Sequence, residues 1–355
     1  MANGLGLRKL SVNVVATLGR QLGSGLLQLV LMAVIARAYG PSGNGAYSVA
    51  LLLPMLLSSF LNLGVGPANV YFLGAGLIHP RVAWKRTLKI YVLLCSLGLA
   101  IGAGVIFIFG TKWFPGLNED LLWVSLLVFP FSLLLALVSS FFQGLQEFKK
   151  FNLALLLQPF ATLLLTLLII IAGFGGLYLL VVAYLVGVVL TLAVAVRQLL
   201  PMLGEVEQNS NESVPLLSYG LKSHLSNIIT FLNYKTDLFL INYFVGPLGA
   251  GIYVVAVQLV EKLWVLSTAV SAVLLPRLSQ LSSDERRKSM LTPLICRWVL
   301  LFTFVASLIL LAVAPTLIEL VFGTQFEGAF PVLAALVPGI VLWAGGRVLA
   351  NDIAS

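Results

Sequence analysis

Two rows of polar side chains run through segments that are otherwise strongly apolar. Within residues 11–36 and again within residues 216–244, polar residues recur at steps of three and four, so each row lies on one face of a helix. The rows are Asn13, Thr17, Arg20, Ser24 and Gln28, and then Lys222, Ser226, Thr230, Asn233 and Asp237. Cationic, amide and hydroxyl groups arranged in this way bind anions and form hydrogen bonds with polar ligands. For any single Ser or Thr, the alternative is a hydroxyl bonded back to its own helix.

Several charged residues lie deep inside the apolar segments, where insertion of a charge costs roughly 2.5–3.5 kcal/mol. Arg20 and Lys235 are therefore predicted to meet an anion or water. The alternative is a structural ion pair, either Lys235 with Glu261 or Lys262 with Asp237. Asp237 and Glu261 are also candidates for coupling to protons or sodium ions.

The sequence offers no constellation for catalysis, and we expect neither an enzyme nor a cofactor or metal site. It has no Gly-rich phosphate loop ending in Lys-Ser or Lys-Thr, and no grouping of Ser, His and Asp. His79 and His224 are far apart, and Cys95 and Cys296 sit in or beside apolar runs. The formal net charge of +8 does not indicate nucleic acid, because the basic residues cluster in short gaps between apolar runs.

Composition shows which elements must position these side chains. Sixty per cent of the residues are hydrophobic, only 10% are charged, and the mean hydropathy is +1.05. Because a soluble domain has far more charge, the chain is predicted to be an all-α polytopic membrane protein. Ten spans are predicted, at about 11–36, 46–64, 88–109, 121–142, 152–171, 177–196, 216–244, 249–275, 291–314 and 329–349. Polar groups are costly against lipid tails, so both rows are expected to face a common polar cleft.

Lysine and arginine are distributed unequally between alternate joints of the predicted spans. Sixteen of the 21 basic residues fall on one side, whereas the opposite joints hold only Arg37 and Lys112. Cytoplasmic joints carry the excess of positive charge. The N-terminus is therefore predicted to be cytoplasmic, in a multi-pass membrane protein.

The chain contains an internal repeat. Residues 40–50 (GPSGNGAYSVA) recur as residues 246–256 (GPLGAGIYVVA), in each case between the first and second spans of a half. Similar Gly-Pro turns arising by chance are the alternative, but the Tyr and Ala at fixed spacing argue against it. The repeat unit holds six spans, so both copies enter the membrane from the same side, which predicts two parallel lobes with a cleft between them.

The predicted lobes are residues 1–200 and 215–355, joined by a polar, acidic stretch at 201–214. We interpret this stretch as a flexible cytoplasmic linker. The second copy has four spans instead of six. We therefore expect the second lobe to be incomplete and the chain to be part of a longer protein, or else a naturally shortened form.

Short motifs in a fixed order carry a resemblance to a known family. The motifs are residues 36–41 (ARAYGP), 45–47 (GAY), 63–66 (LGVG), 142–150 (FQGLQEFKK), 234–237 (YKTD), 246–247 (GP), 251–253 (GIY) and 322–326 (FGTQF). On these motifs the sequence resembles the Wzx-type O-antigen and exopolysaccharide flippases of the multidrug/oligosaccharidyl-lipid/polysaccharide exporter superfamily, whose fold is MATE-like.

The resemblance implies a flippase that moves a polyprenyl-diphosphate-linked oligosaccharide from the cytoplasmic to the outer leaflet of the inner membrane. Membrane lipids and components of the polysaccharide polymerase would be its other partners. Arg20 and Lys235, with Lys222 at the cytoplasmic mouth, would hold the diphosphate. Hydrogen bonds to the sugars would come from Gln28, Asn227, Asn233 and Tyr234.

Three other functions stay open at this point. A cation-coupled multidrug exporter would be expected to have an acidic cavity, and a lipid II flippase would be essential for growth. A non-transporting membrane scaffold is the third.

Overall fold

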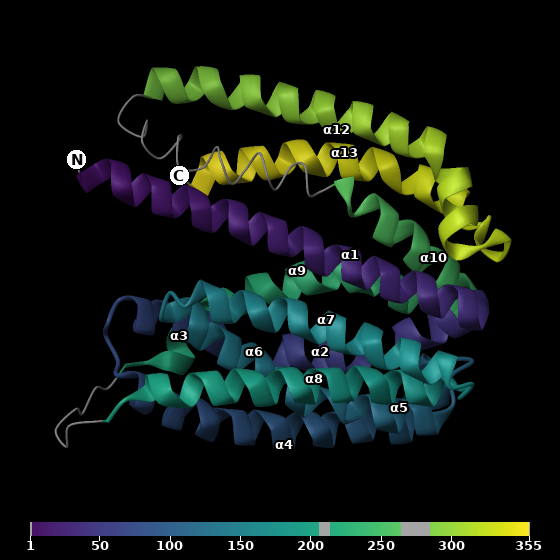
Figure 1. Cartoon of the computed structure of the whole chain (residues 1–355), viewed down its shortest axis with the longest axis horizontal. Coiled ribbons are helices and arrows are strands. Elements are labelled where there is room, and N and C mark those ends of the chain that lie inside the picture. Colours follow the sequence, from purple (N-terminus) through teal and green to yellow (C-terminus); the bar gives the residue numbers. More distant parts are fainter. Residues whose placement is uncertain (1, 206–213, 264–284, 355) are drawn as a thin grey trace. The chain divides into compact units, whose positions relative to one another are not determined.

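The computed structural model describes residues 2–205, 214–263 and 285–354, and this part of the chain is helical without a β-strand (Figure 1). Its α-helices are α1 (Ala2–Ala50), α2 (Leu52–Leu61), α3 (Val65–Gly74), α4 (Pro80–Trp113), α5 (Glu119–Leu126), α6 (Val128–Gly144), α7 (Phe148–Ile171), α8 (Leu177–Leu199), α9 (Leu216–Val245), α10 (Pro247–Val260), α12 (Glu285–Phe322) and α13 (Ala329–Ala354). Two short 3₁₀-helices are η1 (Leu200–Leu203) and η2 (Thr324–Phe326).

Seven helical stretches in the described part are long and apolar enough to cross a membrane. Helix α9 is as long but carries three charged residues, and α10 is a shorter apolar helix. Large apolar side chains point outward, with Phe107 85% exposed and Ile171 79% exposed. Such a surface needs lipid around it. The prediction of an all-α, multi-pass membrane protein is confirmed.

The two Gly-Pro joints of the repeat have the same backbone conformation. Gly40 has φ 66° and ψ −173°, and Gly246 has φ 87° and ψ −176°. Positive φ is open to glycine at little cost, and the following proline has the φ that starts a helix. Two segments 206 residues apart therefore share both sequence and geometry, as the repeat predicts.

The glycine three residues after each joint is also explained by geometry. A Cβ on Gly43 would lie 2.5 Å from the Cβ of Tyr39, and one on Gly249 would lie 2.5 Å from Cγ1 of Val245. In both copies the residue before the kink folds its side chain over the next helical turn. Only a residue without a side chain fits beneath it, which accounts for the Gly-Pro-X-Gly pattern.

Proline explains two of the differences between the predicted and observed boundaries. The joint predicted over residues 40–45 is a kink at Gly40 alone, because the helix resumes at Pro41 and continues to Ala50. The span predicted at 121–142 is divided at Leu127 into α5 and α6. Pro130 has no N–H to bond the carbonyl of residue 126, so the helix weakens at this turn.

By their internal contacts the residues form two compact units, one of residues 23–250 and one of residues 1–22 with 251–355. These units are groups defined by packing, whereas the predicted lobes are groups defined by repetition, so the lobe boundaries at 200 and 215 stay a prediction. In the second unit α12 packs along α13, where a Cβ on Gly345 would lie 2.9 Å from Leu300 Cδ2.

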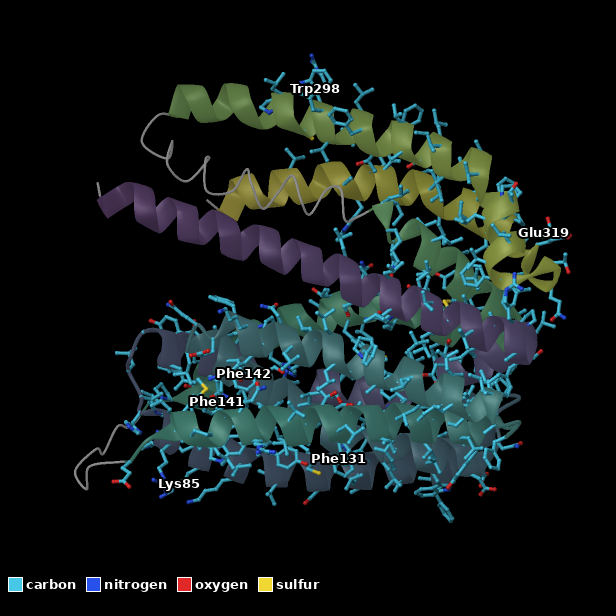
Figure 2. The ribbon with its side chains drawn as sticks, viewed as in Figure 1. Lys85, Phe131, Phe141, Phe142, Trp298 and Glu319 are labelled. Atoms are coloured by element: carbon cyan, nitrogen blue, oxygen red, sulfur yellow. The ribbon has the colours of Figure 1, made fainter. Side chains whose placement is uncertain are left out.

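In the unit of residues 23–250, α6 packs between α3 and α8, and α7 lies along α8 (Figure 1). Phe141 and Phe142, on α6, are fully buried in its core (Figure 2). The ends of the predicted linker are held by α4: Arg81 Nη1 donates to the carbonyl of Gly204 (3.0 Å) and Arg86 Nη1 to that of Val214 (3.4 Å). Residues 206–213, most of that linker, lie outside the described residues.

Helix α9 packs closely against the turn between α2 and α3. A Cβ on Gly64, whose φ is +70°, would lie 2.0 Å from the carbonyl oxygen of Gly220. One turn further along α9, Nε2 of His224 lies 2.8 Å from the carbonyl oxygen of Phe60. Two backbones meet here with no side chain between them, so glycine is needed on both sides.

Candidate functional site: a polar cavity among apolar helices

A cavity of about 910 Å³ lies within the unit of residues 23–250. Its lining comes from α1, α3, α6, α7, α8 and α9, together with the turn residue Asn62. Amides, hydroxyls and phenols supply the polar groups: Ser24, Gln28, Asn62, Tyr71, Ser132, Ser139, Ser140, Gln143, Gln158, Tyr184 and Tyr219. None of the described lining residues is Asp, Glu, Lys, Arg or His. A hydrogen-bonding cavity of this size inside an apolar bundle is a candidate ligand site.

Proline determines how α1 joins the cavity wall. Pro159 in α7 has no N–H, which leaves the carbonyl of Leu155 without its helical donor. The hydroxyl of Ser24, on α1, donates to that carbonyl at 3.2 Å. Gln28 Nε2 in turn donates to Ser24 Oγ at 3.4 Å. The polar row of α1 is thus anchored to α7 where a backbone acceptor is free.

A buried chain of hydrogen bonds fixes another part of the wall. Thr87 Oγ1 donates to Asn69 Oδ1 (3.1 Å), Asn69 Nδ2 donates to Ser140 Oγ (3.2 Å), and Ser140 donates to the carbonyl of Leu137 (2.6 Å). Asn69, Thr87 and Ser140 are almost fully buried and tie together α3, α4 and α6. Each heavy atom has a partner, so this network holds Ser140 rigidly at the cavity.

Aromatic rings form a third part of the lining. Tyr71 of α3 and Tyr219 of α9 stack with centroids 4.7 Å apart and planes 13° apart. Phe72 meets the edge of Tyr219 at 5.3 Å. Tyr184, on α8, supplies a phenol to the same cavity. Rings held on two sides present a firm surface on which a ligand can lie.

Among the residues predicted for the site, Gln28 lines the cavity. Asn233 is exposed on α9, and the side chains of Tyr234, Lys235, Asp237 and Glu261 are half-buried. The side chains of Arg20, Lys222 and Asn227 lie outside the part of the structure that is described. The roles assigned to all of these residues stay predictions.

Two of the charged groups weighed for ion pairs have contacts of other kinds. Lys262 Nζ donates to Gln258 Oε1 at 3.2 Å, and Asp237 Oδ1 accepts the backbone N–H of Leu238 at 2.6 Å. Each contact lies within its own helix or turn.

Most of the cavity was missed by reasoning from the sequence, because its polar residues are single interruptions of apolar spans. The missed residues include Ser132, Ser139, Ser140 and Gln143, which recur at steps of seven, one and three along α6. That spacing, considered over the whole segment, is the one signal that could have indicated a polar face.

We expect Ser24→Ala to lower the free energy of unfolding by about 1 kcal/mol, because the Leu155 carbonyl loses its donor. In a Pro159→Ala background the cost should be smaller, since residue 159 then supplies an N–H to the same carbonyl. Thermal unfolding in detergent of the wild type, the two single variants and the double variant gives the coupling free energy between positions 24 and 159. An equal cost of Ser24→Ala in both backgrounds would contradict this account of the anchor.

Comparison with solved structures identifies the fold of the chain. The chain is similar to an inward-facing MATE-family multidrug resistance transporter of the MOP superfamily (TM-score 0.64, 13% identity, 93% of this chain and 82% of that one). It is also similar to a MATE protein in the straight conformation (TM-score 0.67, 14% identity, 97% and 81%) and to the lipid II flippase MurJ in an inward closed conformation (TM-score 0.71, 15% identity, 94% and 74%). The chain has the MATE-like fold, as predicted.

The sequence itself gives the family. Residues 34–331 match the model of a family described as polysaccharide biosynthesis protein, and the chain belongs to that family. No curated protein matches it. The resemblance drawn from the short motifs is thereby confirmed at the level of family and fold.

Proposed function

We propose that the protein is a flippase that moves a polyprenyl-diphosphate-linked oligosaccharide from the cytoplasmic to the outer leaflet of the inner membrane. The single observation that carries the proposal is the cavity lined by amides, hydroxyls and tyrosines within an apolar helical unit. A sugar headgroup cannot cross hydrocarbon unaided, because each unsatisfied polar group costs several kcal/mol there. Membership of a polysaccharide biosynthesis family supports this class of substrate.

In the proposed mechanism the sugars occupy the cavity, with Gln28 among their hydrogen-bonding partners, and the lipid tail stays in the bilayer. Arg20, Lys222 and Lys235 hold the diphosphate, to which cations bind with charge-assisted hydrogen bonds. Asn227, Asn233 and Tyr234 add hydrogen bonds, and Asp237 or Glu261 couples transport to an ion. Exchange of access comes from rocking of the two repeats.

The proposal is tested with the purified chain in proteoliposomes. A fluorescent polyprenyl-diphosphate trisaccharide is placed in both leaflets, and the fraction accessible to an added glycosidase is followed over time. We expect accessibility to rise beyond the outer-leaflet share only when the protein is present. Protein-containing vesicles in which only that share is cleaved would contradict the proposal.

Cells carrying a deletion of the coding sequence separate the rival functions. Loss of surface polysaccharide together with accumulation of the lipid-linked oligosaccharide supports the proposal. Failure of growth in every background indicates a lipid II flippase, and sensitivity to cationic drugs alone indicates a multidrug exporter.

A further inference from the structure

The described wall of the cavity in the unit of residues 23–250 is polar and carries no charge. Its amide side chains, Gln28, Asn62, Gln143 and Gln158, can both donate and accept hydrogen bonds. The hydroxyls of its serines also donate and accept hydrogen bonds, from shorter side chains. Sugar hydroxyls also donate and accept, so this lining matches a ligand whose groups are hydroxyls rather than ions.

The stacked pair of Tyr71 and Tyr219 adds a second feature suited to sugars. One face of a pyranose ring is made of C–H bonds, and aromatic rings accept such a face by dispersion and weak C–H contacts. Phe72 braces Tyr219 from its edge. The lining therefore combines hydrogen-bonding groups with a flat apolar surface. A sugar ring has the matching combination of hydroxyl groups and an apolar C–H face.

A carboxylate is expected to bind weakly at this wall. A uronic acid whose carboxylate lies against the described lining exchanges water for neutral dipoles. An ion that no group of this lining neutralises pays far more for desolvation than a hydroxyl does. The nearest buried network, Asn69, Thr87 and Ser140, uses its groups on one another. It has no cation to offer the ligand.

We infer that this cavity is a subsite for uncharged sugar units and that it discriminates against repeat units bearing a carboxylate at the same position. The inference rests on the proposed function and specifies its substrate class. Gln143, half-buried on α6 at the cavity, is the position where one added charge would alter the discrimination.

The test measures the transport rates of two polyprenyl-diphosphate trisaccharides by the purified full chain in proteoliposomes. The two substrates differ in one sugar residue, which is glucose in one and glucuronic acid in the other. We expect the glucuronic acid substrate to be moved at least about tenfold more slowly. Gln143→Arg should raise the rate for that substrate by about tenfold. Gln146→Arg is the matched control, because Gln146 is exposed three residues further on and does not line the cavity; it should leave both rates unchanged.

Each result decides a separate point. Equal wild-type rates for the two substrates overturn the charge discrimination and leave the flippase function intact. Movement of neither substrate contradicts the proposed function itself. If Gln143→Arg fails to fold, Gln158→Arg on α7 introduces the same charge from another helix. If a folded variant does not raise the transport rate of the acidic substrate, the assignment of the subsite is overturned.

Discussion

Gly220→Ala is expected to destabilise the protein by about 1–3 kcal/mol or more, although Gly220 lies in a regular helix. In an open helix the same change would stabilise by up to about 1 kcal/mol, because alanine has the higher helix propensity. Here the new Cβ would lie 2.6 Å from the carbonyl oxygen of Leu63 and 2.7 Å from the carbonyl carbon of Gly64. These are backbone atoms, which cannot rotate aside as the end of a side chain can. Helix α9 must therefore move away from the turn between α2 and α3.

Two matched controls separate this contact from other effects of glycine. A Cβ on Gly104 in α4 meets nothing within 4 Å, so Gly104→Ala should keep or raise the unfolding temperature. Gly64 and Gly76 both have positive φ, +70° and +65°, but only Gly64 meets another backbone. Gly64→Ala should thus cost clearly more than Gly76→Ala. If Gly220→Ala is as stable as Gly104→Ala in detergent, the close packing of α9 is wrong.

The helices and the repeat could be predicted because their causes are local in the sequence. Hydropathy over about 20 residues defines a span, and each of the ten predicted spans overlaps a helix in the described part of the chain. Residues 264–275 of the span predicted at 249–275 lie outside the described residues. The Gly-Pro joints were visible because positive φ at Gly40 and Gly246 requires glycine, and their shared geometry follows from shared residues. A feature with a local cause can therefore be recognised from the residues beside it in the sequence.

Apart from Ser24 and Gln28 of the first polar row, the cavity wall could not be predicted, because its cause is tertiary. Gln143 and Gln158 are ordinary interruptions in their own spans, and only the packing of α6 and α7 with α8 brings their helices around one space. The break at Leu63–Gly64 is similar: the span predicted at 46–64 gives no sign of the partner, Gly220, that lies more than 150 residues away. The anchoring of Ser24 likewise depends on a carbonyl released by a proline in another helix.

Arg20→Ala is expected to reduce transport of the lipid-linked oligosaccharide by at least about tenfold, while the protein still inserts in the membrane. The proposed role of Arg20 is to hold the diphosphate, and removal of one partner from a desolvated charge pair costs about 2–5 kcal/mol. Insertion should not suffer, because a charge deep in a span itself costs roughly 2.5–3.5 kcal/mol to insert. The measurements are surface polysaccharide in complemented deletion cells and the amount of protein in the membrane fraction.

Lys112→Ala is the matched control, since it removes one exposed positive charge from the end of α4, outside the polar rows. It should leave transport unchanged. Arg20→Lys should retain part of the activity, because an ammonium keeps the charge but loses the two-pronged bonding of guanidinium to phosphate oxygens. Normal transport by a well-inserted Arg20→Ala protein would remove Arg20 from the diphosphate site. The polar row of α1 would then have a structural role, in which its side chains bind neighbouring helices as Ser24 binds α7.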